Sequence, residues 1–463
     1  MEGKLGVGLI LRLPIARREC RGDVSDQAFV SGSSGEDVET TALVLKSARP
    51  KRARRLKTLL LAGVFAGLAG SALAEGEPEL PTEGVFTAGS GIIGPPIAGT
   101  LQVQQATPRA IIDWRTFSIG QGGAVSILNG QGATLNRVTG SQMSVIRGSL
   151  TATGSVYLVN PQGVVVSGEG RILAGGAIGL LTRDVSTTGF LSGGPFTAQG
   201  RSDAGVVNLG QIISSGGDVF LVGASVRNEG EISAGSGLAG LAAADTVVIS
   251  PGQGVRGLYI AAGSTGSGDV TAAGHIDAAA AALASAGGDV YVLAGNRTGT
   301  IQATGVRQSG GEVWLSAPEG NVRVEGGVRA ARDGAGGDIT VSGRSVTLTG
   351  SAVLDASGTR GGNVLVGVTA PRTGLSDVTT IESGAQILAG GPAGGGLIET
   401  SGRLMTIADA VIRAGEGGHQ RPAADGRDKR HRRRLAGHRF RGHHRRRADQ
   451  LDGIGLPDPR RLP

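Results

Sequence analysis

A four-residue element recurs along this chain of 463 residues: two glycines, a polar residue and an aliphatic residue. Copies begin at Gly216, Gly287, Gly310, Gly336, Gly361 and, in degenerate form, Gly395. The four copies from Gly287 to Gly361 follow one another at intervals of 23, 26 and 25 residues. Such a period is typical of solenoid proteins, in which each repeat packs on its neighbours to build a continuous core.

Each copy opens a short alternating strand, such as "DVYVLA" or "DITVSG", and a second strand follows after a turn. Alternation points the aliphatic side chains inward, and glycine supplies the corners. An aromatic content of only 3% suits a narrow interior. A β-sandwich also uses such strands, but not at a near-constant spacing of 25 residues. The sequence therefore predicts an all-β, right-handed parallel β-helix.

One segment departs from the alternation. "HIDAAAAALASAG", from His275, is rich in alanine, the strongest helix former. Asp277 could serve as its N-cap. The pattern predicts one or two turns of helix bulging from a corner of the coil.

The N-terminal region has the pattern of a signal peptide at residues 51–74. A basic stretch, 51–57, precedes an apolar run at 59–69 and an Ala-Leu-Ala cleavage site ending at Ala74. The apolar run is shorter than the ~20 residues that a membrane-spanning helix needs. We expect export with cleavage after Ala74, and residues 1–50 to be a leader or a mis-assigned start.

Residues 134–185, beginning "TLNRVTG" and containing "NPQG" at 160–163, resemble the secretion domain of the filamentous haemagglutinin family, the passengers of two-partner secretion. "IIDWRTFSIGQGGAVSI" at 111–127 resembles the Trp and Phe strand of that family. The resemblance implies a secretion (haemagglutination activity) domain at 75–205 with an N-terminal β cap, followed by β-helix repeats at 206–419. It also implies an outer-membrane Omp85/TpsB-type transporter as partner, an adhesin-like protein on the cell surface or in the medium, and a receptor on a host or neighbouring cell.

Six residues are the candidates for transporter recognition or for shaping the turn: Asn136, Arg137, Asn160, Pro161, Gln162 and Gly163. Pro161 presets a turn, Gly163 permits positive φ, and the Asn160 side chain can cap the turn. The family has Asn where Gln162 stands, which puts a local side-chain hydrogen bond in doubt. A structural role and direct transporter contact both remain open, while Trp114 and Phe117 are predicted to plug the core of the cap.

The body of the chain offers little for catalysis. Between residues 75 and 418 it holds one histidine, His275, and no cysteine, so a His-based triad or a zinc cluster has almost no components. We predict no enzyme activity, no cofactor and no metal. The alternatives are a polysaccharide-acting β-helix enzyme, which would need clustered carboxylates, and the N-terminal fragment of a cytolysin or contact-dependent toxin.

Residues 420–463 lose the repeat and contain 13 arginines. The net charge of +7 comes from the two ends of the chain, whereas the body is mildly acidic. One interpretation is a tail that binds nucleic acid or an anionic surface. We favour a frame-shifted end of a longer gene, and therefore a truncated rod with a disordered tail and no nucleic-acid partner.

Overall fold

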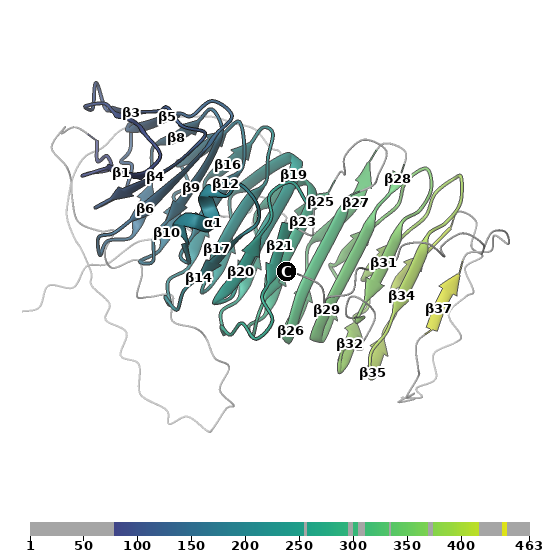
Figure 1. The fold of residues 1–463 in the computed structure, drawn as a ribbon. Helices are drawn as coiled ribbons and strands as arrows, with labels where there is room; N and C mark the ends of the chain where they lie inside the picture. Colours follow the sequence, from purple (N-terminus) through teal and green to yellow (C-terminus); the bar gives the residue numbers. More distant parts are fainter. Residues whose placement is uncertain are drawn as a thin grey trace, which may run out of the picture. The chain divides into compact units, whose positions relative to one another are not determined.

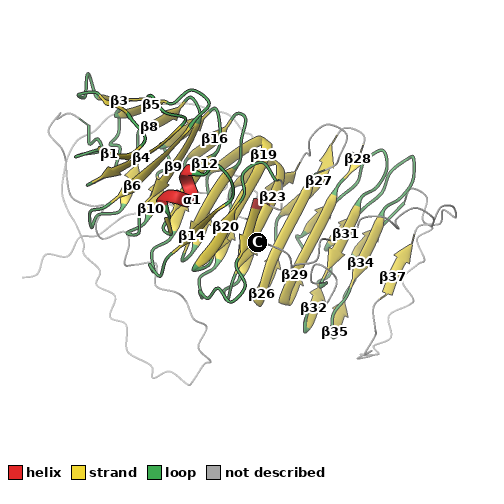
Figure 2. Ribbon diagram, in the orientation of Figure 1, coloured by secondary structure: helices red, strands yellow, loops and turns green. Residues whose placement is uncertain are grey.

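A computed structural model describes residues 78–253, 257–294, 300–303, 311–332, 335–368, 374–415 and 438–441. Within these ranges the chain is built almost entirely of strands, with one short helix (Figures 1 and 2). No helix of the described residues is both long and apolar enough to cross a membrane. The predicted leader, the signal peptide with its cleavage site and most of the tail lie outside the described residues.

Three parallel ladders of strands run through the body, and most coils contribute one strand to each ladder. The first ladder consists of β3 (Thr100–Gln105), β5 (Ala124–Leu128), β8 (Ser149–Ala152), β11 (Arg171–Ala174), β16 (Gln211–Ser214), the first parts of β19 (Glu231–Ala243) and β23 (His275–Ser285), β25 (Thr300–Ala303), β27 (Gly327–Arg332), β30 (Val353–Asp355), β33 (Gln386–Leu388) and β36 (Val411–Arg413).

The second ladder consists of β4 (Arg109–Trp114), β6 (Ala133–Val138), β9 (Ser155–Val159), β12 (Ile178–Leu181), β17 (Val219–Gly223), the second parts of β19 and β23, the first parts of β26 (Glu312–Val324) and β29 (Asp338–Leu348), β31 (Asn363–Val366) and β34 (Leu397–Thr400).

The third ladder consists of β7 (Ser144–Ile146), β10 (Val164–Val166), β15 (Val206–Asn208), β18 (Val226–Asn228), β22 (Val270–Ala272), β24 (Val290–Val292), the second parts of β26 and β29, β32 (Val378–Ile381) and β35 (Leu404–Ile407). The predicted parallel β-helix is confirmed: aliphatic side chains from all three ladders fill one continuous buried core.

The N-terminal end of the helix is closed by antiparallel strands, as predicted. β1 (Val85–Ala88) pairs with β4, and β2 (Gly91–Ile93) pairs with β3, so the free edges of the first coil are covered. The Trp114 and Phe117 rings are 99% buried beneath this cap and meet edge to face, with centroids 5.5 Å apart. A Cβ on Gly84 would lie 2.3 Å from the Trp114 ring, so the first cap residues fit only because this position is glycine.

The alanine-rich segment from His275 is a strand, not the predicted helix. It forms β23, which pairs in parallel with β19 on one side and with β25 and β26 on the other. Most of its side chains are buried on both faces, because Ala281 points into the core and Ala282 lies under an outer layer. Small residues suit a strand enclosed on both faces, and this packing overrides the intrinsic helix preference of alanine.

The glycine pairs do not all mark the same corner. Val219, Val313, Ile339 and Val364 stand in one register on the second ladder, each after its glycine pair. The copy that begins at Gly287 instead precedes Val290, which belongs to the third ladder. Every corner of a coil calls for glycine, so the spacing alone could not tell one corner from another.

A second, smaller sheet lies against the outside of the second ladder. It comprises β13 (Asp184–Val185), β14 (Phe196–Gln199), β20 (Thr246–Ile249) and β21 (Leu258–Ile260), all antiparallel, with the helix α1 (Thr187–Leu191) beside it. We call it the accessory sheet. Phe190, Phe196 and Val247 from this layer bury the outer faces of Leu135 and Tyr157. The sequence analysis does not predict this second apolar layer.

Two further antiparallel strands complete the described elements. β28 (Ala335–Gly336) pairs with β27, and β37 (His438–Arg441) pairs with β34. β37 is a strand within the basic tail, for which the sequence pattern predicts none. The remainder of the tail lies outside the described residues.

Candidate recognition site

The Asn160–Gly163 turn connects β9 to β10. The Gly163 amide donates to the Asn160 carbonyl at 3.0 Å, which closes a β-turn, and Gly163 has φ +117°. The predicted need for glycine at this position is therefore met in the structure. The Gln162 amide donates to Asn160 Oδ1 at 2.9 Å. Because this bond uses the backbone of residue 162, the replacement of Asn by Gln there leaves it intact.

The Asn160 side chain also connects neighbouring coils. It is fully buried, and its Nδ2 donates to the Gln142 carbonyl and to Ser144 Oγ, both at 2.9 Å. From the following coil, the Ser202 hydroxyl donates to the Pro161 carbonyl. The turn is thus held from both sides, and among its four residues only Gln162 is exposed.

Asn136 lies inside the β-helix, beneath the cap. It is fully buried, its Oδ1 accepts from Trp114 Nε1 at 3.0 Å, and its Nδ2 donates to the Tyr157 carbonyl at 3.2 Å. Both functions of the amide are satisfied, as a buried polar side chain requires. In the folded protein Asn136 therefore fixes the Trp114 ring and has no exposed surface.

Arg137 points to the opposite face of β6 and binds the accessory sheet. Its Nε lies 2.9 Å from Asp184 Oδ1, its Nη1 lies 3.4 Å from Asp113 Oδ1, and its Nη2 donates to the Val185 carbonyl at 2.7 Å. The Asn-Arg pair of the sequence motif thus serves two layers: Asn136 faces the core, and Arg137 anchors β13.

Replacing Arg137 by Ala is expected to lower the free energy of unfolding by about 2 kcal/mol, because three polar contacts are lost and the Val185 carbonyl loses its partner. Urea denaturation followed by circular dichroism measures the change. Arg115→Ala is the matched control: its ion pair with Glu83, at 3.7 Å, is largely exposed, and we expect a loss below about 0.5 kcal/mol. Equal losses in the two variants would contradict an anchoring role for Arg137.

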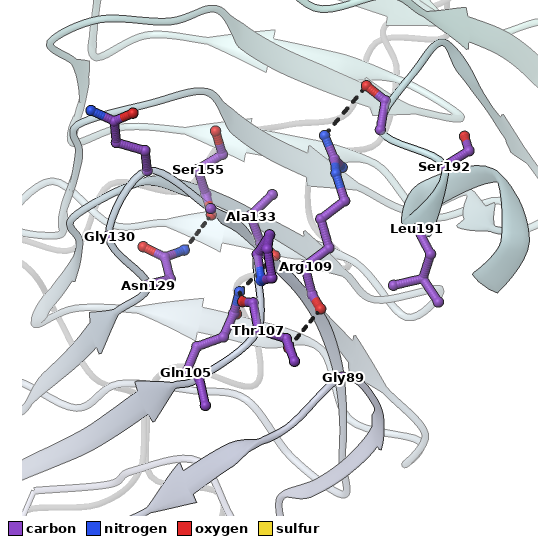
Figure 3. A pocket seen from close by; sticks show the side chains of 15 residues that line it. Gly89, Gln105, Thr107, Arg109, Asn129, Gly130, Ala133, Ser155, Leu191 and Ser192 are labelled. Atoms are coloured by element: carbon purple, nitrogen blue, oxygen red, sulfur yellow. Dashed lines mark hydrogen bonds between the residues drawn. The ribbon is translucent and has the colours of Figure 1, made fainter.

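A groove that the sequence analysis missed lies between a corner of the coils and α1 (Figure 3). Its volume is about 970 Å³, and its lining includes Gln105, Arg109, Asn129, Ser155 and Ser192. A second hollow of about 520 Å³ shares Arg109 and Ser155 with it and extends to the accessory sheet. No sequence motif marks these residues, because they meet only once the insertions that build α1 and the accessory sheet have folded over the second ladder.

No group of three or more His, Cys, Asp or Glu side chains in the described part of the chain is placed to hold a metal ion. The six candidate residues do not form one cluster either. Asn136 and Asn160 are buried, Arg137 faces the accessory sheet, and Gln162 reaches solvent. This arrangement can support a scaffold and offer a turn for recognition.

Comparisons with known proteins agree with the fold. The sequence model of the family described as "TPS secretion domain" matches residues 87–366. The solved structure of the HMW1 secretion domain from Haemophilus influenzae is similar with a TM-score of 0.61 and 25% identity, over 73% of this chain and 91% of that one.

Curated relatives are similar over shorter segments. A heme/hemopexin-binding protein of Haemophilus influenzae is 38% identical over 148 residues, which is 30% of this chain and 16% of the relative. Another protein of the same name and species is 35% identical over 103 residues, 22% of this chain and 11% of the relative. The chain thus spans less than a fifth of the length of these relatives.

Proposed function

The chain belongs to the TPS secretion domain family. From this premise we propose that it is a secreted two-partner secretion passenger, exported by a TpsB-type outer-membrane transporter. We propose further that it is adhesin-like and that its turn at Asn160–Gly163 takes part in export. The family match is the observation that carries the assignment, because it spans the cap and most of the coils. The matches are to secretion domains and to proteins named for binding heme and hemopexin, which supports a non-enzymatic role.

The capped β-helix supports this export route physically. Each coil is completed by pairing with the coil before it, so a chain that arrives unfolded outside the cell can fold by successive addition. The cap closes the edges of the first coil, so growth begins from a defined end. We propose a periplasmic intermediate that an Omp85/TpsB-type transporter binds, after the signal peptide at 51–74 has been removed with all that precedes it by cleavage behind Ala74.

The two roles of the candidate turn can be assigned to different residues. Asn160 is buried and hydrogen-bonded within the folded domain, whereas the Gln162 side chain is exposed. We therefore propose that Asn160 shapes the turn and that Gln162 is the turn residue available for contact with the transporter. A receptor on a host or neighbouring cell is part of the adhesin proposal.

Co-expression of the full chain with its transporter tests the export route. We expect the passenger in the medium at least tenfold above a strain without the transporter, with a β-rich circular dichroism spectrum. N-terminal sequencing of the secreted protein should begin at Glu75, which checks the cleavage site. Equal release in the two strains would contradict transporter-dependent export.

A further inference from the structure

The hollow beside the accessory sheet is lined by a tyrosine whose ring is buried and whose hydroxyl reaches solvent. Tyr157 is 3% exposed and lines this hollow of about 520 Å³. Its ring packs edge to face on Phe190 and Phe196, with centroids 5.6 Å away in each case. The hydroxyl forms no hydrogen bond with any residue that the structure describes. It is not among the buried polar atoms that lack a partner in the described part of the chain, so solvent in the hollow reaches it and a ligand there can accept its hydrogen bond.

Arg109 lines the same hollow and brings a positive charge to it. Its guanidinium lies 5.1 Å from the centre of the Phe190 ring, and it donates to the carbonyls of Phe190 at 3.0 Å and Gly193 at 3.5 Å. Among the described residues it forms no ion pair. Two carbonyls occupy some of its donors but leave its charge uncompensated by any carboxylate.

The Arg109 guanidinium and the Tyr157 phenol line the same hollow. Arg109 and Tyr157 come from β4 and β9, two strands of the second ladder that are separated by β6 alone, and both contact Phe190. A charged donor and a neutral donor directed at one space are the pairing that recognises an oxyanion, and bidentate acceptance from a guanidinium makes a carboxylate the best fit.

The other residues that line the hollow favour a sugar that bears the carboxylate group. Tyr259 stands at the edge of the hollow with 41% of its surface exposed, which offers a ring face to an apolar sugar face. Ser250 also lines the hollow, and the adjoining groove adds the exposed Gln131 and Ser192 side chains, which can exchange hydrogen bonds with sugar hydroxyls. The two volumes fall in the range of small-ligand sites, about 300–1,000 Å³.

We propose that the hollow bounded by Arg109, Tyr157 and Tyr259 binds an acidic saccharide, with its carboxylate held by the guanidinium and the phenol. This is a property of the folded passenger and goes beyond its export.

The groups around Tyr157 keep its hydroxyl a hydrogen-bond donor. Burial, with the charge of Asp218 as a second cause, raises the pKa of Tyr157, so its hydroxyl stays protonated and acts as a donor. Asp218 itself does not compete for Arg109: its two carboxylate oxygens accept from the backbone amides of Leu238 at 2.7 Å and Gly252 at 2.6 Å.

Binding to the purified full chain tests the proposal, with methyl β-glucuronide, methyl β-glucoside and acetate as probes in isothermal titration calorimetry. We expect the glucuronide to bind at least tenfold more tightly than either the neutral glucoside or acetate. Tyr157→Phe should weaken glucuronide binding about tenfold, since it removes a hydrogen bond to a charged group and keeps the buried ring.

Tyr291→Phe is the matched control. It makes the same change at a tyrosine on the third ladder, whose hydroxyl donates to Asp289 at 2.8 Å, and it should leave glucuronide binding unchanged. The proposal is overturned if the glucuronide does not bind, if glucuronide and glucoside bind equally, if acetate binds as tightly as the glucuronide, or if Tyr157→Phe binds like the unsubstituted chain. Because all measurements use folded protein, they are independent of the transporter experiment.

Discussion

Replacing Trp114 by Ala is expected to lower the free energy of unfolding by about 4 kcal/mol, the typical cost of truncating a fully buried Trp. The change opens a cavity under the cap, removes the edge-to-face contact with Phe117, and leaves Asn136 Oδ1 without its donor. We expect a large fall in the urea concentration at the midpoint of unfolding of the secreted protein. Far-ultraviolet circular dichroism measures it, because that signal comes from the backbone and not from the indole ring that is removed.

Trp314→Ala is the control for loss of an indole ring. Trp314 is only partly buried, at the margin of the layer under the accessory sheet, and its Nε1 has no hydrogen-bond partner. We expect a loss of about 1–2 kcal/mol there, because less apolar surface is removed from contact. If both variants lost the same small amount, the cap would not depend on the Trp114 plug.

Replacing Asn160 by Ala is expected to lower the free energy of unfolding by about 3 kcal/mol. It removes two donated hydrogen bonds, to the Gln142 carbonyl and Ser144 Oγ, and the acceptor of the Gln162 amide. Each such bond contributes about 1 kcal/mol net, and the groups left buried without partners add to the loss. Urea denaturation of the secreted variant measures the effect.

Gln162→Ala separates the structural role of the turn from recognition. Its side chain is exposed, so the free energy of unfolding should change by less than about 0.5 kcal/mol. If Gln162 contacts the transporter, export of this variant falls severalfold while its stability stays the same. Unchanged export of the Gln162 variant would leave the turn with a purely structural role and contradict the proposed contact. A stable, well-folded Asn160→Ala protein would contradict the structural role of Asn160.

The repeat in the sequence predicts the coil because it reflects a local rule. Glycine at corners and alternation along strands are needed in every repeat, so the same pattern recurs along the sequence. The cap was expected from the resemblance of the N-terminal block to the family's secretion domain, and the positive φ of Gly163 from its place in the turn that Pro161 begins. These features depend on residues close together in the chain.

What the sequence did not disclose depends on contacts between distant segments. The strand at His275 was mistaken for a helix because alanine's preference is local, whereas the layers that enclose β23 come from other coils. The groove at Arg109 was missed for the same reason, since α1 reaches it from a position 81 residues further along the chain. The corner of the coil at which Gly287 lies could be identified only from the pairing register of the strands in the structure.

The accessory sheet sets a time order on folding. A coil of the helix can close as soon as its own residues and those of the previous coil are present, but Arg183 donates to the Ala244 carbonyl, 61 residues later. The Arg183 side chain is 1% exposed in the folded protein. Before the segment around Ala244 has folded over it, the guanidinium is in contact with water. Contacts so far apart in sequence form slowly. For a chain that folds from its N-terminal end, as proposed above, coil formation precedes closure of the outer layer, and the hollow at Tyr157 forms only with the second step.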